Sequence, residues 1–155
     1  MDNEIYGWHF LGADGRPSRP ISGSSAPIVT GETYRVAGTP VLCQTGLHAS
    51  ERAIDALNYA PGAVVCWVRM GGKVVHGGDK MAASERTVVA QADCTTEIRL
   101  FAIWAAKRTL MRERKEGREP DKRTWNVLTV ATAYLRSRAT LGEMRDAAAD
   151  AAYYA

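Results

Sequence analysis

The sequence predicts an α+β fold: an antiparallel or mixed β-sheet with one short helix, packed with a C-terminal unit of two or three helices. Up to Asp93, short β-branched runs alternate with turns rich in Gly, Ser and Pro, whereas apolar residues recur every three or four positions afterwards. The charge changes at the same point, because residues 1–93 hold 8 basic and 9 acidic side chains and residues 94–155 hold 12 and 8. We therefore expect a strand-rich part, residues 1–93, with a helical part, residues 94–155, packed on it as a single compact domain.

The N-terminal stretch predicts a strand and a long loop. Aromatic residues occupy every second position over residues 6–10, which is typical of a half-buried strand, and we expect most of the aromatic side chains to lie in the core. Residues 12–27 are rich in Gly, Ser and Pro and favour a loop. Short extended segments are expected at residues 34–36 and 41–43.

A short helix and a hairpin follow. Residues 51–58 have helical apolar spacing, and Ser50 is the expected cap because its hydroxyl can accept a bond from the free amides. Residues 64–70 are apolar and β-branched, which predicts a central strand. Gly71-Gly72 favours a two-residue hairpin into the next strand, residues 73–76, and residues 87–90 give one more strand.

The helical part divides into three segments. Thr95 or Thr96 can cap the first, and residues 117–120 break it. The second begins at Thr124. Thr140 with Glu143 forms a capping box for the third, whose stripe is mostly alanine and therefore needs a closely packed partner.

Residues about 34–90 resemble a phage- and prophage-encoded domain of unknown function. The resemblance depends on Leu42-Cys43-x-x-Gly46-Leu47-His48-Ala49-Ser50, Ala56-Leu57-x-Tyr59, the strand of residues 64–68 and Asp79-Lys80 with Ala83-Ser84-Glu85-Arg86. The C-terminal part is similar to alanine-rich helical segments that accompany such domains and occur in bacterial immunity proteins. Together these resemblances imply mobile-element conflict biology, in which small proteins act by binding a larger machine.

The sequence argues against a protein that spans a membrane, is secreted or is held together by disulfides. The longest apolar run, residues 63–68, is too short to cross a bilayer. The acidic N-terminus is unlike a signal peptide, and three cysteines form no even disulfide framework. We therefore expect a protein of the bacterial cytoplasm without a membrane partner.

Few residues have a type and spacing that suggest a catalytic or metal-binding site. Cys43 and His48 have a C-x4-H spacing, but no second close pair completes a zinc site, so we expect no metal and no cofactor. One alternative is an ADP-ribosyltransferase-like enzyme using NAD, because a similar order of strand, helix and strand follows His48 and Ser50; Glu85 would be its acid. The structural interpretation is that His48 fixes a turn and Ser50 caps the helix.

Basic and aromatic residues of the helical part suggest two surfaces. The favoured protein interface comprises Arg118, Lys122, Arg123, Trp125, Tyr153 and Tyr154. A second alternative is nucleic-acid binding through Lys107, Arg108, Arg112, Arg114 and Lys115. Acidic residues between them weaken the positive electrostatic field of this set.

We expect a non-enzymatic phage or mobile-element accessory protein that binds a host protein or protein complex. The most specific version is an inhibitor of a bacterial defence system such as a CRISPR effector. A homodimer through the C-terminal helices is a further expectation.

Overall fold

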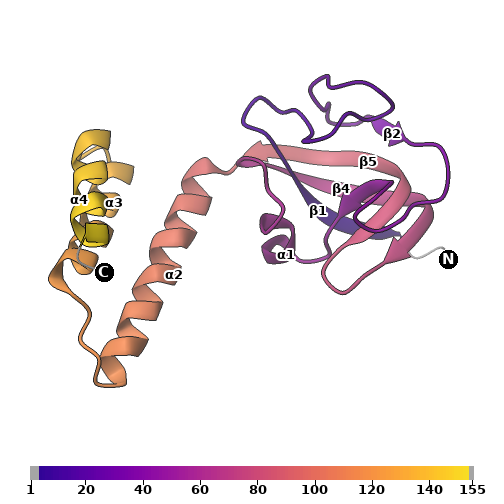
Figure 1. Ribbon diagram of the computed structural model, residues 1–155. Helices are drawn as coiled ribbons and strands as arrows, with labels where there is room; N and C mark the ends of the chain where they lie inside the picture. The colour runs from indigo at the N-terminus through magenta and orange to yellow at the C-terminus, as the bar shows by residue number, and fades with distance from the viewer. Residues whose placement is uncertain (1–3, 154–155) are drawn as a thin grey trace. The chain divides into compact units, whose positions relative to one another are not determined.

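The α+β fold is confirmed in a computed structural model, which describes the chain from Glu4 to Tyr153 (Figure 1). The chain divides into two compact units, Met1–Cys94 and Thr95–Ala155, which we call unit 1 and unit 2. Unit 1 holds the strands and one short helix, and unit 2 holds three helices among its described residues. Packing of the helical part on the strand-rich part stays a prediction.

The sheet of unit 1 is antiparallel throughout. Its strands are β1 (Ile5–Leu11), β2 (Thr33–Arg35), β3 (Leu47–Ala49), β4 (Val64–His76) and β5 (Met81–Asp93). The strand order is β1-β4-β5-β2, and β3 pairs with β5 beyond the end of β2. The strand predicted over residues 64–70 therefore lies inside the sheet, between β1 and β5.

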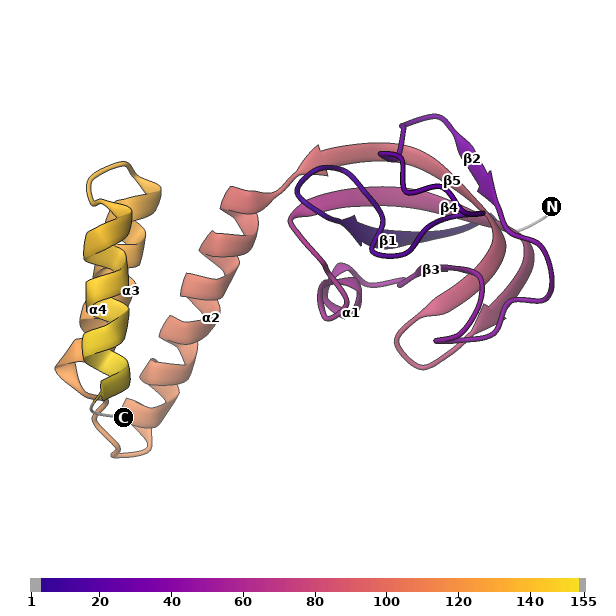
Figure 2. The ribbon, with the colours of Figure 1, turned by 45° about the horizontal axis from the view of Figure 1, so that its top comes forward.

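A bent sheet brings β3 back to β1. Ser50, directly after β3, exchanges two backbone hydrogen bonds with Trp8 of β1, at 2.7 and 2.9 Å. The helix α1 (Ala53–Leu57) follows, and Figure 2 shows it beside the end of β3. β1, β3 and β5 therefore surround one region of unit 1.

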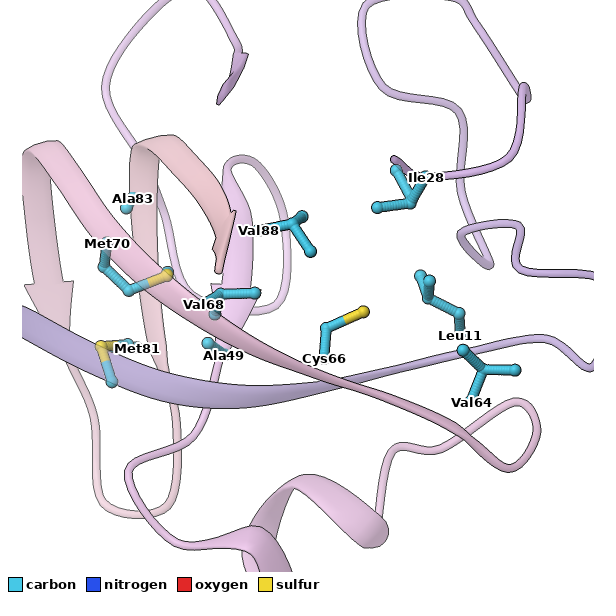
Figure 3. Close-up of a cluster of buried hydrophobic side chains, with 10 residues drawn as sticks. All are labelled: Leu11, Ile28, Ala49, Val64, Cys66, Val68, Met70, Met81, Ala83 and Val88. Atoms are coloured by element: carbon cyan, nitrogen blue, oxygen red, sulfur yellow. The ribbon is translucent and has the colours of Figure 1, made fainter. Parts of the chain in front are cut away.

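The core of unit 1 lies on one face of the long strands. Cys66, Val68 and Met70 project from β4 toward Met81 and Val88 of β5 in Figure 3. Along β1 the same face carries Ile5, Gly7, His9 and Leu11, because side chains alternate along a strand.

The aromatic side chains of β1 lie on the opposite face, contrary to the expectation that most of them are core. Tyr6 and Trp8 are half-buried. Tyr6 stacks on Trp67 of β4 with ring centroids 5.5 Å apart, and the Trp8 ring lies tilted against Trp67 at 4.7 Å. Phe10 is buried, but Phe101 and Trp104 of unit 2 are exposed. Aromatic stacking thus covers the outer face of β1 and β4.

Two further sequence expectations are wrong. Gly71-Gly72 forms no hairpin: β4 runs through both glycines with a register shift, and the chain turns at residues 77–80, where the Gly77 amide bonds to the Lys80 carbonyl at 2.8 Å. Residues 41–43 form a turn closed by Val41 and Thr45, not a strand. The second strand of the hairpin is correspondingly β5, which is longer than the predicted residues 87–90.

Unit 2 contains α2 (Thr95–Lys115), α3 (Lys122–Leu135) and α4 (Leu141–Tyr153). Asp121 caps α3 by accepting a bond from the amide of Arg123 at 2.8 Å, so this helix begins slightly before Thr124. The capping box before α4 is confirmed, because Thr140 and Glu143 bond reciprocally at 2.7 to 3.2 Å. Figure 2 shows α3 and α4 side by side, and Ala147 is the buried residue of the alanine-rich helix α4. No described helix is long and apolar enough to span a membrane.

Candidate site: a cationic pocket in unit 1

A pocket of about 570 Å³ opens in unit 1 where β1, β3 and β5 meet. Pockets of this size hold small organic ligands. Its polar side chains come from segments far apart in the chain and include His9, Arg19, Cys43, His48, Ser50, Tyr59, Lys80 and Arg86. None of its lining residues, all within the described part of the chain, is acidic.

Arg86 on β5 is the most deeply buried charged group described in the structure, with 2% of its surface exposed. Its Nη1 donates to the carbonyl oxygen of His48 at 2.9 Å, whereas its Nε is buried without a hydrogen-bond partner. Burial lowers the pKa of Arg86 to about 10, which still leaves it charged at neutral pH. A buried cation with neither a described carboxylate nor a full set of acceptors is costly to the folded state.

His9 on β1 has a second unpartnered atom, because its Nε2 is also buried without a hydrogen bond. Burial, followed by the positive charge of Arg86 and then by His48, holds the pKa of His9 well below its usual range. At neutral pH the imidazole is therefore uncharged. We call the pair His9 and Arg86 the floor of the pocket.

His48 is tied to the turn that precedes β3. Its Nε2 accepts a bond from the Cys43 amide at 3.2 Å, and a backbone hydrogen bond with Gly46 also contributes to its pKa. The pKa of His48 is lowered, first by burial and then by the charge of Lys80. Cys43 and Gly46 have φ values of 64° and 106°, so the turn is tight, and at Gly46 a side chain would also meet Pro40. The hydrogen bonds of His48 agree with the structural role, which is to hold this turn.

Three side chains at the mouth are more exposed, and we call Arg19, Tyr59 and Lys80 the rim. The Lys80 ammonium lies 3.9 Å from the centre of the Tyr59 ring. Hydrogen bonding with Tyr59, and next with Cys43, raises the pKa of Lys80. The Tyr59 hydroxyl donates to Asp79. Within the described residues, neither Lys80 nor Arg19 forms an ion pair, so neither charge has an acidic counterion there.

The structure brings two of the three proposed transferase residues together. His48 and Ser50 line the pocket, but Glu85 does not and instead pairs with Arg35 at 3.3 Å. Because side chains alternate along β5, Glu85 projects opposite to Arg86. The pocket therefore has no carboxylate beside His48 and Ser50 among the residues that line it.

Ser50 is not the cap of α1. Its backbone bonds to Trp8, its surface is 2% exposed, and the N-cap position belongs to Arg52, which makes no side-chain capping bond. Pairing with β1 fixes Ser50 in the sheet, so it cannot also take the capping position.

The sequence-predicted surfaces lie in unit 2, where acids neutralise several of the cations. Arg114 pairs with Glu119 at 3.0 Å, and Arg118 pairs with Glu113 and Glu116. Arg123 pairs with Asp121 and Asp150, each at 3.6 Å. The remaining cations of the two predicted sets are exposed: Lys107, Arg108, Arg112, Lys115 and Lys122.

Trp125 and Tyr153 differ in their surroundings. Trp125 is half-buried in a groove of about 430 Å³ between α2 and α3, together with Ile103 and Leu128. The lining also includes Lys107 and two arginines that sequence reasoning did not assign to a site, Arg136 and Arg138. Tyr153 is 82% exposed, and Tyr154 lies outside the described residues.

Sequence reasoning missed the floor of the pocket. A signal existed in the alternation of two strands, because His9 is in phase with the core residue Leu11 and Arg86 is in phase with the core residue Val88. A polar residue at a core position is more informative than an apolar one.

No group of three or more His, Cys, Asp or Glu side chains in the described residues is placed to hold a metal ion. No curated protein and no solved structure matches the chain. Residues 27–100 match a family described as a domain of unknown function, and this segment carries β2 to β5 with Arg86, His48 and Lys80, but not β1 with His9. Residues 34–90, which carry the resemblance predicted from the sequence, lie inside this matched segment. Residues 27–100 are therefore similar to the DUF7666 family, a domain of unknown function.

Proposed function

We propose that unit 1 is a binding domain for a small anionic ligand, which occupies the pocket and accepts hydrogen bonds from its floor. The observation that carries this proposal is Arg86, a buried cation with one unpartnered nitrogen in a pocket whose lining has no acid. Folding places this charge inside the protein at a free-energy cost that the observed contacts do not offset. An anion supplies the missing partner.

The chemistry of the floor fits an oxyanion. The Arg86 guanidinium has five N–H groups in a planar fork, which matches the oxygens of a phosphate or a carboxylate. Nε2 of His9 adds a second polar atom to the same floor. An oxyanion bound there accepts a hydrogen bond from an N–H group of the guanidinium and balances its charge.

Titration calorimetry with inorganic phosphate and acetate tests the proposal. We expect wild-type protein to bind at least one of them and Arg86→Met to lose at least about tenfold in affinity, because charge-assisted bonds dominate such sites. Arg35→Met is the matched control, since Arg35 is exposed and pairs with Glu85 on the other face of β5. An affinity unchanged by Arg86→Met, or no binding of either anion, contradicts the proposal.

A second candidate function is protein binding by unit 2. Leu100, Trp104 and Met111 on α2 are 51%, 53% and 56% exposed, which is unusual for large apolar side chains. This exposure supports protein binding by unit 2. The phage accessory protein that binds a host protein, with its more specific version as an inhibitor of a defence system, stays a prediction. Affinity capture from defence-bearing cells should recover a stoichiometric partner that Trp104→Ser loses.

The control for this capture is Val89→Ser, because Val89 is a similarly exposed apolar residue of unit 1, at 47%. Equal capture by both variants contradicts a role for α2. A complex of two identical chains would instead support the predicted homodimer.

The other two alternatives stay predictions with their own tests. The transferase requires that labelled NAD modify a target and that Glu85→Ala abolish the transfer. The nucleic-acid alternative requires affinity that falls steeply with salt.

A further inference from the structure

The pocket has two cationic ends. Arg86 lies in the floor, and Lys80 and Arg19 belong to the rim, so the three charges come from β5, the β4–β5 turn and the loop after β1. A single small anion on the floor satisfies Arg86 and leaves the two rim charges without a counterion among the described residues. Like charges that converge on one cavity repel each other unless a ligand separates and neutralises them.

The pocket also has apolar lining residues and is larger than one oxyanion needs. Pro20, Ile21, Val36 and Leu47 contribute to the lining, and the cavity measures about 570 Å³. Pockets of about 300–1,000 Å³ are typical for organic ligands, with apolar walls and a few polar groups that fix orientation. An organic body between two charged groups would fill this space.

We infer that the ligand is a phosphorylated metabolite with two negatively charged groups on an organic body, one bound at the Arg86 floor and the other at Lys80 and Arg19. This inference rests on the proposed function and adds the ligand class to it. Phosphate groups suit both ends, because arginine forks bind them in a bidentate manner and lysine binds them as a point charge.

Four probes test the inference by titration calorimetry: inorganic phosphate, AMP as the nucleotide with one phosphate, adenosine 3′,5′-bisphosphate and fructose 1,6-bisphosphate. We expect at least one of the two diphosphorylated probes to bind about tenfold more tightly than inorganic phosphate, because it engages both ends of the pocket. A sugar bisphosphate and a nucleotide differ in their organic body, so the tighter of the two shows which body the apolar wall accepts.

Lys80→Met tests the contribution of the rim separately from that of the floor. It should weaken the diphosphorylated probe about tenfold and change the affinity for inorganic phosphate by less than about twofold, because inorganic phosphate occupies the floor. Lys73→Met on β4 is the matched control, since Lys73 is exposed and does not line the pocket.

The outcomes distinguish this inference from the proposed function. If inorganic phosphate binds through Arg86 and neither diphosphorylated probe binds more tightly, the inference is wrong and the anion-binding function stands. If Lys80→Met weakens every probe equally, the rim acts only by long-range attraction and the inference is likewise wrong. If no anion binds, both fail.

Discussion

Arg86 donates a hydrogen bond from Nη1 to the carbonyl oxygen of His48 at 2.9 Å, and this bond links β5 to β3 at the pocket. The same guanidinium keeps its Nε unpartnered and buried. One nitrogen of Arg86 therefore contributes to the sheet, and another has no hydrogen-bond partner among the described residues. Because Arg86 has both a structural bond and a proposed binding role, substituting it can change the stability of the protein and its affinity for the ligand independently.

Arg86→Met should abolish anion binding without unfolding unit 1. We expect the free energy of unfolding to change by no more than about 1 kcal/mol, or to rise, because an apolar replacement removes a buried charge along with its single bond to His48. Urea denaturation of the full chain measures this. A loss above about 3 kcal/mol would show that Arg86 is mainly structural.

The stability of the protein should fall as the pH decreases below about 6.5. Unfolded His9 binds a proton near that pH, whereas its folded pKa is well below it, so acid favours the unfolded chain. The groups facing His9 are Arg86, His48, whose pKa is also lowered, and Cys66, whose thiol stays neutral because burial raises its pKa to about 11. For each histidine, the free energy of unfolding changes by at most about 1.4 kcal/mol per pH unit.

His9→Gln tests that contribution. Denaturation between pH 7.5 and 5.5 should show a shallower slope for the variant than for the wild type, and a slope unchanged by the substitution would contradict the burial argument. The range ends above the ordinary carboxylate pKa values, so Asp and Glu contribute little to it.

Gly72→Ala should destabilise unit 1 by about 1–3 kcal/mol. Gly72 has a φ of +66°, and an added Cβ would lie 2.2 Å from the Ser84 hydroxyl oxygen, which accepts a bond from the Lys73 amide. Gly78→Ala is the control, since a Cβ added there would have nothing within 4 Å and its φ is not left-handed. Equal stability of the two variants in thermal denaturation would contradict the strain at Gly72.

Thr140→Ala should destabilise α4 by about 0.5–2 kcal/mol, because the hydroxyl accepts the bond from the Glu143 amide. Circular dichroism during heating measures the loss of helix. Thr129→Ala is the matched control: the Thr129 hydroxyl bonds back to the Trp125 carbonyl inside α3, and alanine is the better helix former there. A Thr140 variant as stable as the control would show that the capping box adds nothing.

The fold was largely predictable because most of its signals are local. The alternation in β1, the apolar run of β4 and the capping box of Thr140 and Glu143 each depend on neighbouring residues, and all three are confirmed. The hairpin expected at Gly71-Gly72 is wrong for a reason that is not local. Because the chain turns at residues 77–80 instead, Val74 of β4 pairs with Ala83 of β5. Val74 therefore packs against the core cluster that contains Ala83.

The site was less predictable because its residues are far apart in the chain. His9 and Arg86 meet the same pocket only after β1, β4 and β5 have paired, and an arginine beside Glu85 is locally typical of a surface ion pair. The pairing of Ser50 with Trp8 is likewise a long-range contact that overrides a good local capping signal.

The register of β1 has a consequence for synthesis of the chain. Ile5 pairs with Met70, so the first strand must wait until more than sixty further residues have left the ribosome before it can dock. Contacts this distant in sequence form slowly, whereas helices joined by short turns form quickly. We expect the nascent N-terminal strand to remain without its sheet partner during this interval, which makes it the segment of unit 1 that most needs protection by a chaperone.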